Sequence, residues 1–153
     1  MSGVPERSRM VPPLPLLVGL VLGLGCGLVW PWPIGPHAVV LTCGILLLGL
    51  VGVAVWWLLH AFRRHDTSAD PKDEVTAIVD TGPFRYSRNP AYISAAMLQV
   101  AVGLLFNTAW VLLTTIPAMI VIQFVVVLKE EAYLEHEFGD AYLEYKSRVR
   151  RWI

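Results

Sequence analysis

Most of the side chains that could do chemistry lie in two short polar segments, residues 81–92 and residues 129–134. The first segment holds arginine, asparagine and tyrosine side chains around a proline, and the second holds two adjacent glutamates directly after an apolar run. Such groups can bind an anion, accept hydrogen bonds from hydroxyl or amino groups, and surround a cation with aromatic rings. Together they suit a ligand that is zwitterionic, flat at one end and cationic at its centre.

The first segment contains the start of a predicted helix. Asn89 is a favourable N-cap, and Pro90 is a favourable first helical residue. The free N–H groups and the positive dipole end of that helix, with Arg88 beside them, would attract a carboxylate or a phosphate. The alternative is that these residues only begin a helix, while the nearby arginines pair with lipid head groups.

The second segment includes Glu130 and Glu131, which follow an apolar run almost directly. Adjacent carboxylates at a membrane boundary are costly unless they are solvated or paired. If the last two apolar runs form an antiparallel hairpin, these glutamates lie near Arg88 and Asn89. Arg88 and Glu131 are therefore candidate catalytic residues. The alternative is a solvated helix end whose glutamates only pair with neighbouring arginines.

Long uncharged stretches supply the elements that position these groups. Residues 10–62 and residues 91–128 contain no Lys, Arg, Asp or Glu. A helix that spans the hydrocarbon core of a bilayer takes about 20 apolar residues. The sequence therefore predicts an all-α polytopic membrane protein with four transmembrane helices in a single domain. The predicted spans are residues 13–30, 37–62, 90–106 and 108–128.

The charges of the loops predict the orientation. Basic residues flank the spans on one side only, whereas the loops at residues 31–36 and 107–108 carry no charge. The positive-inside rule then places both termini in the cytosol. The protein is expected in a bacterial inner membrane, with its site facing the cytosol.

The polar segments outside the spans are predicted to cover the site. The tail, residues 129–153, should form a helix to about Glu137, break at Gly139 and continue as a second helix with Asp140 as its N-cap. In the connector, residues 75–79 form a short apolar run that is expected to pack against the helices.

The composition argues against several other classes of protein. The formal net charge is zero, so the totals do not favour nucleic-acid binding. Cys26 and Cys43 lie inside apolar runs, where we expect small buried residues and neither a disulfide nor a zinc site. No metal site is predicted. The spans lack interior charges and paired broken helices, so nothing supports a transporter.

Several motifs follow one another across residues 75–152. They are Gly-Pro-Phe-Arg-Tyr-Ser-Arg-Asn-Pro-Ala-Tyr at residues 82–92, Glu130-Glu131, Phe138-Gly139, Tyr142-Leu-Glu-Tyr145-Lys and Val149-x-Arg151-Trp152. In this order, beside a membrane hairpin, they resemble the isoprenylcysteine carboxyl methyltransferase and phospholipid methyltransferase superfamily. The series is specific, whereas a lone Arg-Asn-Pro would not be.

The resemblance implies S-adenosylmethionine as the methyl donor and a lipophilic, membrane-embedded acceptor. It implies that the donor binds at the cytosolic ends of the last two spans, under the tail. Glu130 would accept a hydrogen bond from a ribose hydroxyl or the amino group of the donor, and the helix N-terminus with Arg88 would hold the carboxylate. The implied cofactor-binding residues are Thr76, Ala77, Ile78, Val79, Phe84, Asn89, Pro90, Ala91, Tyr92 and Glu130, of which residues 76–79 would be strand-like.

The chain departs from the isoprenylcysteine branch at three positions. That branch has His where Asn89 stands, Tyr where Phe84 stands, and a substrate-binding Arg where Val126 stands. The acceptor therefore stays open among a lipid amine, a prenylated or isoprenoid carboxylate and a lipophilic thiol. The alternative function is a non-enzymatic membrane protein, or a subunit of a complex, that retains the family fold.

Overall fold

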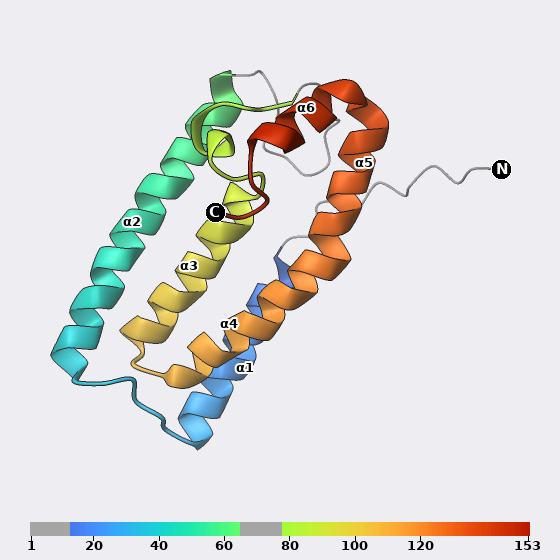
Figure 1. Ribbon diagram of the computed structural model, residues 1–153. Helices are drawn as coiled ribbons and strands as arrows, with labels where there is room; N and C mark the ends of the chain where they lie inside the picture. The colour runs from blue at the N-terminus through green and yellow to red at the C-terminus, as the bar shows by residue number, and fades with distance from the viewer. Residues whose placement is uncertain (1–12, 65–77) are drawn as a thin grey trace.

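The computed structural model describes residues 13–64 and 78–153, and within these ranges the chain forms helices and no strand (Figure 1). In chain order, the elements are α1 (Leu14–Val29), α2 (His37–Arg64), the 3-10 turn η1 (Gly82–Arg85), α3 (Pro90–Leu105), α4 (Ala109–Val121), the π-helical segment η2 (Ile122–Val127), α5 (Leu128–Phe138) and α6 (Asp140–Arg148).

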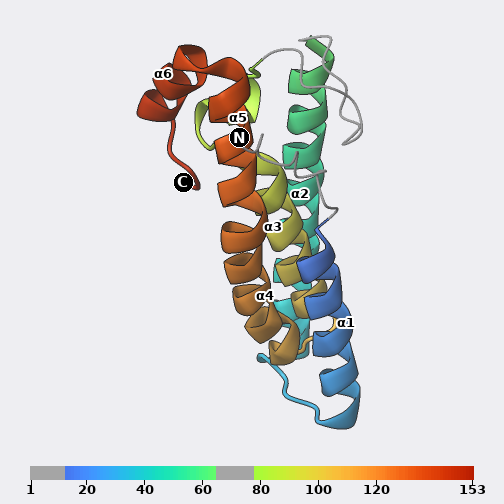
Figure 2. The same cartoon turned by 90° about the vertical axis from the view of Figure 1, so that its right-hand side faces the viewer.

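The four long helices lie side by side in an order that differs from their order in the chain. α1 packs against α4, α4 packs against α3, and α3 packs against α2. α5 continues the line of α4, and α6 then folds back toward the start of α3 (Figures 1 and 2). The start of α3 and the end of the α4–η2–α5 helix are thereby at the same end of the bundle.

The helix boundaries agree closely with those predicted for the spans and for the start of the tail. α2 and the continuous helix at residues 109–138 are each long and apolar enough to cross a membrane by length and composition, whereas α1 and α3 are shorter apolar helices of 16 residues each. The helix of the last span continues past residue 128 to Phe138, as predicted for the first part of the tail. The number of spans and the side on which the termini lie stay predictions.

The contact between α1 and α4 depends on small residues. A Cβ atom added to Gly23 would lie 2.7 Å from Cα of Val111, which is closer than two carbon atoms can pack. Gly23 therefore allows the backbones of the two helices to approach closely, in the way that small residues do between membrane helices.

The two cysteines correct one expectation. Cys26 and Cys43 are both exposed on the outer surface of the bundle, so the prediction that they are buried is wrong. The reason is that these helices carry apolar residues on their outer faces as well, and large side chains such as Val21 and Leu46 are more than 60% exposed there. An apolar run in such a helix therefore does not imply burial within the protein.

Hydrogen bonds close one end of the bundle, which we call the turn end (residues 30–36 and 106–110). Asn107 has a φ of 48°, and its side-chain Oδ1 accepts hydrogen bonds from the backbone N–H groups of Ile34 and Gly35 at 2.9 and 3.3 Å. Its Nδ2 donates to the carbonyl of Gly35 at 3.0 Å. The indole Nε1 of Trp110 donates to the carbonyl of Trp30 at 2.8 Å. The α1–α2 loop is thus tied to the α3–α4 turn.

The tail forms two helices with a break at Gly139, as predicted. Gly139 has a φ of 52°, which reverses the chain within one residue. The N-cap of α6 is Gly139, and Asp140 is already helical, so the predicted N-cap is displaced by one residue. The physical reason is that the carbonyl of Gly139 already accepts from the N–H groups of Tyr142 and Leu143.

The apolar run before η1 is described only in part, because Thr76 and Ala77 lie outside the described residues. Ile78 and Val79 belong to no strand, so the strand-like interpretation is wrong for this pair. Val79 is buried, and Ile78 packs against the buried cluster of Tyr142, Tyr145 and Val149. The predicted packing of this run against the helices is confirmed for Ile78.

Candidate functional site

The hairpin of α3 and α4 brings the two polar segments together. The hydroxyl group of Tyr92, in the first turn of α3, donates to Oε1 of Glu130 in the first turn of α5 at 2.9 Å. Tyr92 and Glu130 are both partly buried. The predicted proximity of the two segments is therefore confirmed, and we call this end of the bundle the polar end (residues 87–92, 130–131 and 150–153).

Glu131 lies at the centre of a buried cluster of charges. Its carboxylate accepts two hydrogen bonds from Arg151, Nε to Oε1 at 2.9 Å and a second nitrogen to Oε2 at 2.8 Å. A terminal nitrogen of Arg88 lies 3.1 Å from Oε1 of the same carboxylate. The side chains of Arg88 and Glu131 are only 10% and 7% exposed. One carboxylate therefore lies between two guanidinium groups and offsets one of their two positive charges. Its hydrogen bonds to Arg151 raise the pKa of that residue.

Sequence reasoning gave Arg151 no role, although it quoted this residue in a motif. Arg88 and Glu131, the two candidate catalytic residues, are paired with each other, and their other partners come from the tail. Nε of Arg88 is buried and has no hydrogen-bond partner among residues 13–64 and 78–153. The nearby hydroxyl of Tyr142 has a raised pKa because it is buried, although Arg88 opposes that effect.

The last four residues, 150–153, form a segment that we call the C-terminal strap. The carbonyl of Arg150 accepts from the backbone N–H of Arg88 at 2.9 Å. The carbonyl of Arg151 accepts from Oγ of Ser87 at 3.2 Å and from Nδ2 of Asn89 at 2.9 Å. The strap is therefore bound to the segment that leads into α3.

These contacts qualify the prediction for the start of α3. Asn89 is the N-cap residue by position and Pro90 is the first helical residue, as predicted. The side chain of Asn89 does not cap the helix, however, because its amide group holds the strap. No side chain in the described part of the chain caps the first turn of α3, so the positive end of this helix keeps the potential to attract an anion.

The structure places Phe84 beside α2 and α6. Its ring packs edge-to-face against Phe62 of α2, with the ring centroids 5.4 Å apart. Its carbonyl accepts from the hydroxyl group of Tyr145 at 2.9 Å. Burial raises the pKa of Tyr145, so this hydroxyl stays a neutral donor. Of the implied cofactor residues, Phe84 thus contacts α2 and α6 and Ile78 packs against α6, whereas Asn89, Pro90, Ala91, Tyr92 and Glu130 belong to the polar end.

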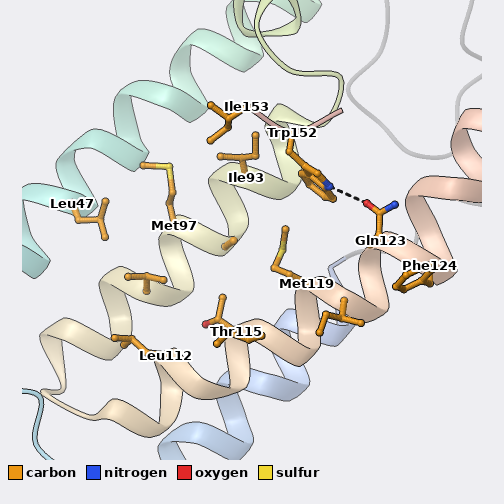
Figure 3. A pocket seen from close by; sticks show the side chains of 14 residues that line it. Leu47, Ile93, Met97, Leu112, Thr115, Met119, Gln123, Phe124, Trp152 and Ile153 are labelled. Carbon is orange, nitrogen blue, oxygen red and sulfur yellow. Dashed lines mark hydrogen bonds between the residues drawn. The ribbon is translucent and has the colours of Figure 1, made fainter. Parts of the chain in front are cut away.

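An apolar groove begins where the polar end stops (Figure 3). It has a volume of about 820 Å³ and runs between α3 and the α4–η2 helix, with one residue of α2 at its side. Thr115 and Gln123 are the polar residues in its lining; the hydroxyl of Thr115 donates to the carbonyl of Val111. The lining residues are Leu47, Ile93, Ala96, Met97, Val100, Leu112, Thr115, Ile116, Met119, Ile120, Gln123, Phe124, Trp152 and Ile153.

Two residues of the strap form one end of this groove. Trp152 and Ile153 line it, and the indole Nε1 of Trp152 donates to Oε1 of Gln123 at 2.9 Å (Figure 3). Sequence reasoning did not predict the groove, Gln123 or Trp152 as part of a site. The only signal was the motif that contains Trp152, because the groove exists only once three helices and the chain end are assembled.

The arrangement can bind an amphipathic ligand. Charged and hydrogen-bonding groups lie at the polar end, and a groove for hydrocarbon follows directly, because Tyr92 contacts Glu130 while the next residue, Ile93, lines the groove. In the described parts of the chain, no three His, Cys, Asp or Glu side chains lie close enough together to hold a metal ion.

Comparisons with known proteins give one family. The model of the phospholipid methyltransferase family matches residues 39–141. An uncharacterized protein of Haemophilus influenzae is 37% identical over 62 residues, which is 40% of this chain and 98% of that protein. No solved structure matches.

Proposed function

Because the chain belongs to the phospholipid methyltransferase family, we propose that it transfers a methyl group from S-adenosylmethionine to a lipophilic acceptor held in the membrane. The observation that carries the proposal is the junction of two environments at residues 92–93. Tyr92 bonds the half-buried carboxylate of Glu130, and Ile93 lines an apolar groove. A water-soluble donor and a hydrocarbon-bearing acceptor can meet only where such environments adjoin.

The polar end has groups that fit the methyl donor. The first turn of α3 lacks a side-chain cap, so its N–H groups and dipole suit the carboxylate of the donor. The carboxylate of Glu130 accepts one bond from Tyr92, and its remaining lone pairs suit an ammonium or ribose hydroxyl group. In this proposal Arg88 and Glu131 shape the site and hold the strap, instead of reacting themselves.

The groove fits the hydrocarbon chain of the acceptor. Its volume lies within the range of sites that bury most of a small amphipathic molecule, and nearly all of its lining is apolar. The polar end of the acceptor would then lie against Trp152 and the start of α3. A lipid amine and an isoprenoid carboxylate both have this shape.

The reaction needs alignment more than chemical activation. Bound S-adenosylmethionine supplies an electrophilic methyl group, and the acceptor atom takes it in line with the departing thioether. The contribution of the chain is to hold both partners in that line and to exclude water. The partly buried polar end and the apolar groove beside it serve these purposes.

Binding of the product analogue S-adenosylhomocysteine tests the donor site. We expect the purified protein in detergent to bind it in isothermal titration calorimetry. Replacing Glu130 by Ala should weaken binding at least 10-fold, whereas Glu137→Ala, at an exposed position of the same helix, should not change it. Failure of the unaltered protein to bind, or equal effects of both substitutions, contradicts the proposal.

Transfer itself is tested in cells fed with labelled methionine. Lipid extracts of cells that produce the protein should contain a labelled lipid that is absent from cells producing the Glu130→Ala variant. A protein that neither binds the analogue nor labels any lipid fits the alternative, a non-enzymatic membrane protein with the family fold.

A further inference from the structure

The C-terminal strap connects the polar end to the groove through consecutive residues. Arg151 holds the carboxylate of Glu131 with two hydrogen bonds, and the next residue, Trp152, lines the groove. The charge cluster therefore holds the backbone from which the indole ring projects.

A second contact fixes the orientation of that ring. Nε1 of Trp152 donates to Oε1 of Gln123 at 2.9 Å, and Gln123 belongs to the π-helical segment η2. Short π-helical segments interrupt an α-helix and occur frequently at functional sites. Trp152 also packs, like Tyr92, against the buried cluster of Leu16, Ala118, Ile122 and Val127. The indole is thus held both by the strap that carries it and by its contacts with the α4–η2 helix.

The ring occupies the end of the groove that lies toward the polar end (Figure 3). Ile93 lines the groove at the same end, and it directly follows Tyr92, the residue that bonds Glu130. Removing the indole would therefore widen the junction between the apolar groove and the polar end and admit water there.

We propose that Trp152 is the positioning residue that ends the acceptor groove and sets how far an acceptor chain extends toward the methyl donor. This inference rests on the proposed function. Gln123 holds the ring in place, and the Arg151–Glu131 pair holds the backbone that carries it. A larger opening at this point would let longer acceptors slide past the transfer position and would expose the site to water.

The reaction rate of an introduced cysteine tests whether Trp152 closes the end of the groove. The test does not require a known acceptor. The background is the Cys26→Ala, Cys43→Ala protein in lipid nanodiscs, since both native cysteines are exposed. Ile93→Cys then reports on the end of the groove beside Trp152. The probe is a permanently cationic methanethiosulfonate, which cannot enter from the lipid side because charge is costly there.

We expect Ile93→Cys to react at least 10-fold faster when Trp152 is replaced by Ala. Trp152→Phe, which keeps a ring but loses the bond to Gln123, should restore most of the protection, and Gln123→Ala should give the same modest increase as Trp152→Phe. Equal reaction rates with and without the Trp152→Ala substitution, or no rescue by Phe, would overturn the proposal.

A cysteine at Leu112 is the matched control, because Leu112 lines the groove nearer the turn end (Figure 3). Its rate should not change on Trp152→Ala. An equally increased reaction rate at both positions would mean that the bundle has loosened as a whole. This outcome would also contradict the proposed role of Trp152. Binding of S-adenosylhomocysteine to the background protein that retains Trp152 is measured separately. Failure of the proposed function then shows as a loss of this binding and does not affect the result for Trp152.

Discussion

The two ends of the bundle are both closed by contacts between distant segments, but the chemistry of these contacts differs. Each ties together segments that are more than 60 residues apart in the chain. The turn end does so with uncharged groups, chiefly the side-chain amide of Asn107 and the indole of Trp110. The polar end does so with a carboxylate between two guanidinium groups, Glu131 with Arg88 and Arg151.

The difference lies in the charge of the groups that remain unpaired. Asn107 uses both its oxygen and its nitrogen in bonds to the α1–α2 loop, and the buried Oγ1 of Thr108, which has no hydrogen-bond partner among the described residues, is uncharged. At the polar end, Nε of Arg88 is buried without a partner among the described residues, and no side chain there caps the first turn of α3. A guanidinium group and an uncapped helix N-terminus attract an anion, whereas a single uncharged hydroxyl group does so only weakly. The comparison therefore predicts that the turn end contributes stability alone and the polar end contributes stability and binding.

The largest effect is expected from Glu131→Ala. This change leaves the buried guanidinium of Arg88 and the partly buried one of Arg151 without their counter-charge. Removing one partner of a buried pair costs about 3–5 kcal/mol. The free energy of unfolding is to be measured in mixed micelles by titration with a denaturing detergent.

The matched control is Glu144→Ala on α6. Glu144 pairs with Arg148, but these side chains are 74% and 60% exposed. Exposed pairs contribute about 0–1 kcal/mol, so stability should hardly change. Similar losses for both variants would mean that the charge cluster at the polar end has no special importance.

A smaller effect is expected from Asn107→Ala at the turn end. The change removes three exposed or partly buried hydrogen bonds to residues 34 and 35, each of which contributes about 0.5 kcal/mol. It also places a Cβ-bearing residue without a polar side chain at a positive φ, which costs about 1 kcal/mol. We expect a loss of about 2–3 kcal/mol in the same titration. Asn107→Gly relieves the backbone strain but not the lost bonds, so it should recover only part of the loss.

Ligand binding by the Asn107→Ala variant tests whether the turn end also contributes to the ligand site. Below its unfolding transition, Asn107→Ala should bind S-adenosylhomocysteine as the unaltered protein does. Weaker binding by the folded variant would show that the turn end also contributes to the ligand site, and the division between the two ends would be wrong.

The smallest effect is expected from Trp110→Phe. The change removes the single bond from Nε1 to the carbonyl of Trp30 and keeps a ring that can pack against Trp32. Because this bond is exposed, we expect a loss of about 0.5–1 kcal/mol. A loss as large as that of Asn107→Ala would mean that ring packing, more than hydrogen bonding, closes the turn end.

The sequence predicted the elements whose signals are local. The start of α3 at Asn89 and Pro90 and the break at Gly139 follow from the conformations that single residues favour. The boundaries of the apolar helices follow from the absence of charge along each run. Even the proximity of Glu130 to the start of α3 could be predicted, because a two-residue turn leaves adjacent helices little choice but to lie side by side.

Only the tertiary structure decided the separate roles of the two glutamates. Glu130 and Glu131 are adjacent in the chain, yet successive residues of a helix point in directions about 100° apart. One therefore meets Tyr92 of α3, and the other meets Arg88 and Arg151. The groove that Trp152 ends has the same origin, since its walls come from three helices and the chain terminus. Local preferences determine where a helix begins and ends. The contacts of each side chain depend instead on which residues the packing of the helices brings next to it.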